Sequence, residues 1–276
     1  MVATPLGNLG DLSERARATL ALAERVLAED TRVTATLLRH CGIATRATSL
    51  HAHNEQRRID EVLGWLAAGL RVALVSDAGT PGISDPGARL VRAALAGGHR
   101  VIPVPGPSAV AAAVSAAGLA AEQFVFVGFL PAQAKARTAL LERIAPLPFA
   151  LVFYEAPHRV RATVQRLRGA LGDARTLVVA REISKRFEEI ARLSLAEADA
   201  WFAADSNRER GEFVLVVDAE AAADPAQAGA IDATAAQWLA ALATEMPPAA
   251  AARIVAAVTG APRDLLYARA VALRER

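Results

Sequence analysis

Residues 75–87 read V-S-D-A-G-T-P-G-I-S-D-P-G, and they hold three glycines and two prolines within thirteen positions. The stretch follows an apolar run at 72–75 and precedes a helix-like segment at 88–96, a pattern that indicates a strand, a loop and a helix. Glycine permits backbone angles that other residues avoid, and proline lacks an N–H group, so such a loop exposes much of its backbone. Two interpretations remain open: a long turn, or a loop that approaches a ligand at the carboxyl end of a strand.

The first 118 residues alternate between strand-like and helix-like segments around this stretch. Apolar runs suited to strands occupy 1–4, 26–28, 72–76 and 101–105, and helix-like segments occupy 11–23, 31–40, 54–68, 86–96 and 108–117. Asp11 and Asn54 are the expected N-caps of the first and third helices. Continuous apolar strands alternating with helices predict a parallel sheet.

The pattern changes near Gly118. Strand-like runs follow at 124–128, 149–154, 176–181, 188–193 and 212–217, and the last two favour an antiparallel part of a mixed sheet. An Ala-, Asp- and Gly-rich segment at 220–231 is interpreted as a linker, and helices are expected at 233–242, 249–258 and 263–273. We therefore expect an α/β protein with two α/β domains, 1–118 and 119–219, and a linker with a small helical domain at 220–276.

Composition excludes several classes of protein. No run of about eighteen apolar residues suggests a membrane span, and the N-terminus lacks the features of a signal peptide. One cysteine and five scattered histidines offer no metal-ligand spacing, so no metal is expected. A cytoplasmic location is the simplest expectation. The net charge of +2 permits nucleic-acid binding without requiring it.

Four loops should gather at one edge of the predicted parallel sheet. They occupy 4–10, 28–32, 76–87 and 103–109, and each follows a predicted strand and precedes a predicted helix. Neither G-x-G-x-x-G nor the phosphate-binding G-x-x-x-x-G-K-[ST] occurs, and no lysine precedes residue 135. Loops rich in backbone, hydroxyl and carboxylate groups suit a neutral or cationic ligand better than a polyphosphate, and S-adenosylmethionine fits that description.

A series of motifs then points to a family. In order, the chain contains V-A-T-P-L-G-N-L, A-E-D-T-R, L-V-S-D-A-G-T-P-G-I-S-D-P-G, P-V-P-G-P-S-A, G-F-L-P, F-Y-E-A-P-H-R and A-R-E-I-S-K-R-F-E-E. Over residues 2–218 this series closely resembles the 2'-O-methyltransferase branch of the tetrapyrrole methylase superfamily. The resemblance implies a homodimer that transfers a methyl group from S-adenosylmethionine to the ribose of a decoding-centre cytidine in 16S rRNA of the 30S subunit. A tetrapyrrole C-methyltransferase and a non-catalytic RNA-binding assembly protein are the alternatives.

The resemblance also implies a set of cofactor-binding residues. They lie at the ends of predicted strands in both domains: Pro5, Asp77, Gly79, Thr80, Pro81, Ser84, Ser108, Ala109, Tyr154 and Glu155. Ser108 is alternatively a helix N-cap, and Asp85 is expected to cap the helix that begins at Pro86. Asp77 is the better candidate for the positive groups of the ligand.

A base that removes the proton of the ribose hydroxyl would assist the transfer. Lys185 and Glu182 are the predicted catalytic residues, with Glu155 and His158 as further candidates. Lys185 is one of two lysines in an arginine-rich chain, and a buried lysine can become neutral where an arginine cannot. A phosphate contact or a surface position is the alternative for Lys185. Arginines on the helices of the second domain are candidates for RNA contact or for an ordinary solvated face.

Overall fold

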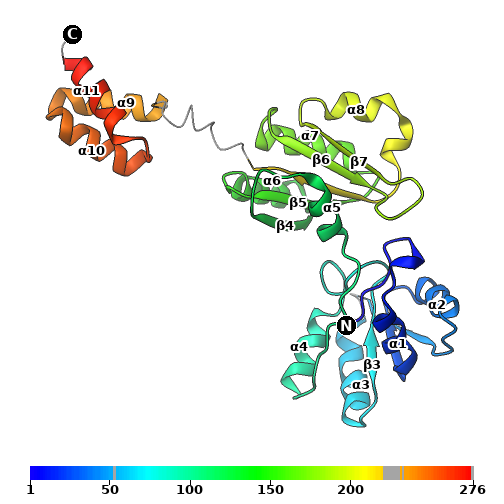
Figure 1. Cartoon of the computed structure of the whole chain (residues 1–276). Coiled ribbons are helices and arrows are strands. Elements are labelled where there is room, and N and C mark those ends of the chain that lie inside the picture. The colour runs from blue at the N-terminus through cyan, green and yellow to red at the C-terminus, as the bar shows by residue number, and fades with distance from the viewer. Residues whose placement is uncertain (52–53, 220–230, 232, 275–276) are drawn as a thin grey trace. The chain divides into compact units, whose positions relative to one another are not determined.

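The structure is a computed structural model that describes residues 1–51, 54–219, 231 and 233–274. The chain divides into two compact units, Met1–Ala219 and Glu220–Arg276, and the first unit contains two sheets (Figure 1). The α/β class, the mixed second sheet and the helical C-terminal part agree with the predictions. The functional division into three domains stays a prediction.

A parallel sheet of order β2-β1-β3 forms the centre of the N-terminal part. Its elements are η1 (Leu9–Asp11), α1 (Glu14–Leu22), β1 (Arg25–Ala28), α2 (Thr31–His40), β2 (Ala47–Ser49), α3 (Glu55–Ala67), β3 (Val72–Leu74) and α4 (Ala88–Ala96). Helix α5 (Ala109–Ala117) follows in sequence but packs against the second sheet (Figure 1). Strand β1 is buried at Val26, Leu27 and Ala28, as a central parallel strand should be. Strand β2 was not predicted, because three residues of mixed polarity carry little periodicity.

Two expected strands are reduced to isolated bridges. Val2 pairs with Val104 in parallel, and Thr4 pairs with Gly79 in antiparallel fashion. Proline explains the loss of ladder: Pro5 follows the first segment, and Val104 lies between two prolines, which donate no backbone hydrogen bond. The first segment still lies beside β3, because the N–H of Val2 donates to the carbonyl of Leu74 at 2.8 Å. The second lies beside the first, because the N–H of Val104 donates to the carbonyl of Met1 at 2.8 Å.

Two helix starts differ from the predictions. Helix α1 is capped by Ser13, whose hydroxyl accepts from the N–H of Ala16 at 3.1 Å, and not by Asp11. Helix α4 begins at Ala88 and not at Pro86, with Gly87 at φ +127° as its N-cap, so Asp85 is not its cap. Asn54 is the N-cap residue of α3 but makes no side-chain cap bond.

A buried glutamate from another helix caps α4. One oxygen of Glu55, at the start of α3, accepts from the N–H groups of Gly87, Arg89 and Leu90 at 3.0–3.2 Å. The negative charge lies at the N-terminus of the helix, where it interacts favourably with the helix dipole. This contact fixes the end of the 76–87 loop to the core and releases Asp85 from any capping role.

A mixed sheet of order β4-β5-β8-β6-β7 organises the following part. Its elements are β4 (Phe124–Phe129), α6 (Ala134–Ile144), β5 (Ala150–Glu155), α7 (Val160–Leu171), β6 (Thr176–Arg181), β7 (Glu189–Ser194), α8 (Ala198–Ala204), η2 (Ser206–Glu209) and β8 (Phe213–Val217). Strand β8, the last in sequence, inserts antiparallel between β5 and β6 and is buried throughout. This insertion brings residues 205–212 beside the loop between β6 and β7.

The C-terminal unit contains α9 (Ala233–Glu245), α10 (Pro248–Thr259) and α11 (Arg263–Arg274). Alanines together with Leu239, Val255 and Leu266 form its core. Gly260 ends α10 at φ +73°, a left-handed C-cap that favours glycine. The predicted linker at 220–231 lies almost entirely outside the described residues. None of the helices in the described ranges combines the length and the apolar character needed to cross a membrane.

Candidate active site

A cavity of about 480 Å³ lies where the N-terminal loops meet the second sheet. All four predicted loops contribute to its wall: Leu6 from the first, Glu29 from the second, residues 78–80 and 83–85 from the third, and Ser108 with Ala109 from the fourth. The expectation that these loops converge is confirmed. The carboxyl ends of neighbouring parallel segments reach the same edge, which is why loops far apart in sequence line one hollow.

Backbone hydrogen bonds hold the loop around Gly79 in place. Its N–H and carbonyl pair with those of Thr4 at 3.0 and 2.9 Å, and the hydroxyl of Thr80 donates to the carbonyl of Pro107 at 2.9 Å. Gly79 has φ +81°, and a Cβ there would lie 3.2 Å from a methyl of Leu6. Glycine at this position is therefore a requirement of the turn.

The N-terminal wall carries carboxylates without a basic neighbour in the cavity. Glu29 and Asp85 line it, and none of its lining residues in the described chain is Lys, Arg or His. Burial raises the pKa of Asp85, and the charge of Asp77 adds to the effect. Burial also raises the pKa of Glu29, with contributions from Asp85 and Asp77. The three acids therefore repel one another, and a cation in the cavity would relieve that repulsion.

The sequence suggested Asp77 as the ligand contact and Asp85 as a helix cap, but the structure places Asp85, and not Asp77, in the cavity wall. Asp77 is exposed, does not line the cavity, and accepts from the N–H of Asp30 at 2.9 Å. Asp85 is half-buried and lines the cavity. Asp77 thus acts on the site through its charge, whereas Asp85 is placed for direct contact.

The opposite wall is aromatic near the ends of β4 and β5. Tyr154 packs edge-on against Phe126 and Phe129, with ring centroids 4.9 and 5.7 Å apart. The neighbouring Glu155 is also at the wall, but its carboxylate is committed to the start of α7. It accepts from the hydroxyl of Thr163 at 2.6 Å and lies 3.3 Å from Nε of Arg159. Glu155 is therefore a structural carboxylate in this arrangement.

Lys185 lies in the loop between β6 and β7, beside the cavity rather than in its wall. Its ammonium group is 2.9 Å from Oε1 of Glu182 and 2.8 Å from Oε2 of Glu212. Burial opposes the charge, but the two carboxylates outweigh it and the pKa of Lys185 is raised. Burial acts against the carboxylate of Glu182 as well, yet Lys185 and a backbone bond leave its pKa lowered. In this arrangement Lys185 is a cation, contrary to the neutral amine that a base requires.

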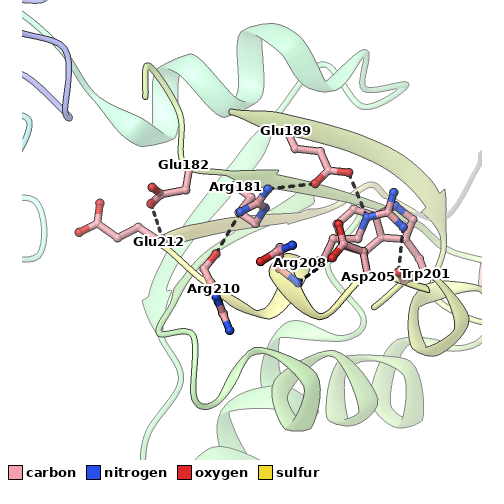
Figure 2. A network of polar contacts seen from close by, with 9 residues as sticks. Arg181, Glu182, Glu189, Trp201, Asp205, Arg208, Arg210 and Glu212 are labelled. Carbon is pink, nitrogen blue, oxygen red and sulfur yellow. Dashed lines mark hydrogen bonds and ion pairs between the residues drawn. The ribbon is translucent and has the colours of Figure 1, made fainter. Parts of the chain in front are cut away.

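An ion-pair network connects the loop between β6 and β7 to neighbouring segments. Arg181, at the end of β6, donates to Glu189 at 3.2 Å and to the carbonyl of Arg210 at 3.3 Å (Figure 2). Glu189 in turn lies 3.1 Å from Nε of Arg208, whose guanidinium stacks 4.4 Å from the Trp201 ring. The carboxylate of Glu182 accepts from the N–H of Glu212 at 3.0 Å, as Figure 2 shows. The network ties the 182–188 loop to residues 205–212.

The structure places the predicted cofactor residues in two groups. Those in the cavity wall are Gly79, Thr80, Ser84, Ser108, Ala109, Tyr154 and Glu155. Pro5 and Pro81 are buried outside the lining, and the hydroxyl of Ser108 also accepts from the N–H of Ala111 at 3.5 Å as the N-cap of α5. Their binding roles stay predictions.

Sequence reasoning missed part of the wall. Phe129, Ile183 and Glu212 line the cavity but were not chosen. Phe129 lies in the G-F-L-P motif, which was a usable signal. No sequence signal pointed to Glu212, because only the insertion of β8 beside β6 brings it to the site.

Several arginines on the helices of the second domain have intramolecular partners. Arg137 donates to two backbone carbonyls, and Arg161 and Arg168 form ion pairs with Glu209 and Asp173. Such exposed pairs leave less free positive charge on this face than the sequence suggested.

Comparisons with known proteins agree with this geometry. The family model of Tetrapyrrole (Corrin/Porphyrin) Methylases matches residues 1–199, and the model of the RsmI C-terminal HTH domain matches residues 229–274. Ribosomal RNA small subunit methyltransferase I of Xylella fastidiosa strain Temecula1 is 47% identical over 97% of this chain and 96% of its own length. The protein of the same name from Pseudomonas aeruginosa is 46% identical over 98% of this chain and 95% of its own.

Solved structures share the fold. The methyltransferase CobJ has a TM-score of 0.61 at 22% identity, covering 80% of this chain and 93% of its own. Uroporphyrin-III C-methyl transferase from Thermus thermophilus, complexed with S-adenyl homocysteine, has a TM-score of 0.55 at 20% identity, covering 79% and 95%. On family models and close relatives together, the chain belongs to the ribosomal RNA small subunit methyltransferase I family, within the tetrapyrrole methylase fold.

Proposed function

We propose that this protein is an S-adenosylmethionine-dependent methyltransferase that acts on the ribose 2'-hydroxyl of a decoding-centre cytidine in 16S rRNA, within the 30S subunit. The observation that carries the proposal is the cavity wall of Glu29, Asp85 and exposed backbone, which includes no basic side chain among the residues that the structure describes. A polyphosphate cofactor would meet repulsion there, whereas a ligand with ammonium and sulfonium charges would be attracted. The relatives that share this chain's length are named as methyltransferases of small-subunit ribosomal RNA.

The residues present fit that cofactor. Glu29 and Asp85 would face its positive groups, the backbone of Gly79 and Thr80 would bind its polar groups, and the rings of Phe129 and Tyr154 offer apolar surface. When bound, S-adenosylmethionine supplies a methyl group that is already activated by the sulfonium. The protein's main task is therefore to hold the ribose hydroxyl in line, because positioning accounts for much of the rate of such a transfer.

We retain Lys185 and Glu182 as the proposed catalytic pair, with a changed role for the lysine. A protonated Lys185 near the ribose would stabilise the negative charge that develops on the attacking oxygen. Glu182 would fix the ammonium, since it lies 2.9 Å from Nζ. Release of Lys185 from Glu212, whose side chain is 73% exposed, would free the ammonium for substrate.

The direct test is methyl incorporation. Labelled S-adenosylmethionine is incubated with 30S subunits that lack the modification, and the position is mapped by resistance of the ribose linkage to alkali. We expect one resistant cytidine linkage in 16S rRNA. Label in a tetrapyrrole and not in 30S subunits would support the C-methyltransferase, and the absence of cofactor binding by calorimetry would support the non-catalytic protein.

Two substitutions separate the roles of Lys185. Lys185→Gln should lower kcat by roughly 100-fold, the usual effect of removing one group that stabilises developing charge. Lys185→Arg keeps the cation and should retain much of the rate. If both variants lose kcat equally and bind the cofactor with unchanged affinity, the result would support Lys185 as a neutral base.

We also propose a homodimer, on the family resemblance alone. Sedimentation equilibrium at micromolar concentration should give twice the mass of the 276-residue chain. A monomer at every concentration would remove this part of the proposal.

A further inference from the structure

One exposed aromatic side chain on the loop beside the cavity lies outside the hydrophobic clusters of the described chain. Phe187 is 64% exposed, although it belongs to the loop between β6 and β7 that supplies Ile183 to the cavity wall. Single exposed apolar residues are common on protein surfaces. This ring differs from them because it follows a proposed catalytic lysine by two residues and because the guanidinium of Arg186 lies over it.

Arg186 and Phe187 form a stacked pair. The guanidinium carbon of Arg186 lies 5.5 Å from the centroid of the Phe187 ring. Arg186 is exposed, and it makes no ion pair with any residue that the structure describes. Its positive charge is therefore available to a phosphate, whereas most neighbouring cations are held by carboxylates.

The loop that carries this pair is held firmly. Glu182 and Ser184 have φ of +52° and +69°, and they are the non-glycine residues with positive φ in the described chain. Such backbone persists only where surrounding contacts enforce it, and it is concentrated at functional sites. Here the hydroxyl of Ser184 hydrogen-bonds to Asp11, and the stem of Lys185 packs so closely on Gly7 that a Cβ at Gly7 would lie 2.4 Å from Cγ of Lys185.

The network of Figure 2 completes the support. Arg181 and Glu182 anchor the first end of the loop to residues 210 and 212, and Glu189 anchors the other end through Arg208. A rigid loop presents its exposed side chains in a fixed orientation, which reduces the entropy lost on binding.

We propose that Arg186 and Phe187 are a stacking platform for an unpaired base of the RNA substrate, adjacent to the nucleotide that enters the cavity. Proteins recognise single-stranded RNA by stacking its bases on aromatic rings and guanidinium planes, with nearby cations on the phosphates. The pair supplies both features on a loop that also reaches the cavity wall. This inference rests on the proposed function, because it takes RNA as the substrate.

The test compares Phe187→Ala with Phe187→Trp. Binding of unmethylated 30S subunits is measured by filter retention, and methyl transfer gives KM and kcat. Phe187→Ala should weaken 30S binding about 10-fold, as expected for the loss of one stacked base. Phe187→Trp should bind within about twofold of wild type, since any flat aromatic ring can stack. Calorimetry should show unchanged affinity for S-adenosylmethionine in both variants.

Substitution of Arg186 gives a second measurement, the salt dependence of 30S binding, which would not change if Arg186 had only a structural role. Arg186→Gln should reduce the slope of log Kd against log salt concentration by about one, because one phosphate contact is lost. Phe124→Ala is the matched control, since Phe124 is 45% exposed at the far end of β4 and should leave 30S binding unchanged.

The outcomes are distinct. Wild-type 30S binding by Phe187→Ala would overturn the platform while leaving the proposed function intact. A shift of Phe187→Ala from dimer to monomer in sedimentation, with normal 30S affinity, would overturn it in favour of an interface between copies. Failure of the wild-type protein to methylate 30S subunits would instead contradict the proposed function.

Discussion

The two walls of the cavity use charge in opposite ways. On the N-terminal wall, Glu29 and Asp85 have no basic partner in the cavity, and their pKa values are raised. Beside the opposite wall, the ammonium of Lys185 pairs with the carboxylates of Glu182 and Glu212, and the pKa of Glu182 is lowered. Unpaired charge costs stability and is retained where a ligand compensates for it, whereas paired charge fixes a loop.

The difference assigns separate tasks to the two halves of Met1–Ala219. Under the proposed function, the N-terminal loops provide the negative field that attracts the cationic cofactor, and the loops at 182–188 and 205–212 provide a rigid frame for substrate contacts. Substitutions at these residues can remove the difference between unpaired and paired charge or measure it.

Reversing the unpaired charge should have the largest effect. Asp85→Lys places a cation in the cavity, and like charges brought together cost several kcal/mol, so affinity for S-adenosylmethionine should fall roughly 100-fold or more. Isothermal titration calorimetry measures the change. Asp60→Lys on the exposed face of α3 is the control and should bind normally. Normal binding by Asp85→Lys would show that the acidic wall does not recognise the cofactor.

Removing the carboxylate that supports the acidic wall should reduce stability. Glu55 accepts three backbone N–H groups at the start of α4, so Glu55→Ala should lower the free energy of unfolding by about 2 kcal/mol. Urea denaturation followed by circular dichroism provides the value. Glu61→Ala, on the exposed end of a surface ion pair in α3, should change it by less than about 0.5 kcal/mol. Equal effects in the two variants would contradict the capping role.

The Glu55 contact also shows where sequence reasoning stops. The strand, loop and helix around residues 72–96 were predictable, because apolar periodicity and Gly/Pro loops are local signals. The cap was not, because its donor and acceptor lie more than thirty residues apart. With that partner unknown, the Asp-Pro pair at residues 85–86 was interpreted as a cap, and Asp85 was passed over as a ligand.

The second wall was less predictable for a topological reason. Local pattern predicts strands near 176–181, 188–193 and 212–217, and it favours an antiparallel part of the sheet for the last two. That β8 lies between β5 and β6 depends on packing across the whole sheet. The ion pair of Lys185 with Glu212 follows from this arrangement, so a sequence argument for a neutral lysine could not anticipate it. The pair with Glu182 is local, because the two residues are three positions apart in one loop.

The raised pKa values predict a pH dependence of cofactor binding. A bound cation favours the ionised carboxylates, so binding to Glu29 and Asp85 releases protons where they are partly protonated. Affinity should therefore rise with pH through the raised pKa values, which lie above the ordinary 4.5 and 3.8, and level off at higher pH. Isothermal titration calorimetry at a series of pH values measures this rise in affinity.

The stability of the free protein should change with pH in the opposite direction, so that it falls as the pH rises. Ionisation of a carboxyl with a raised pKa disfavours the folded state, so these two groups destabilise the protein above their folded pKa values and cease to do so below the ordinary ones. Calorimetry across this pH range, repeated with Asp85→Asn, separates their contribution. A pH profile that is identical in Asp85→Asn would contradict the assignment.

The paired wall should respond least to the loss of its most exposed charge. Glu212 is 73% exposed in its pair with Lys185, and such surface pairs contribute roughly 0–1 kcal/mol, so Glu212→Gln should change the free energy of unfolding by less than about 0.5 kcal/mol. Glu182→Ala removes both the contact with Lys185 and the bond to the N–H of Glu212, so it should cost more, about 1–2 kcal/mol. Urea denaturation of the two variants measures the difference. If Glu212→Gln were the more destabilising variant, the loop at 182–188 would depend on the exposed pair of Lys185 and Glu212. Release of Lys185 from Glu212 toward the substrate would then be unfavourable.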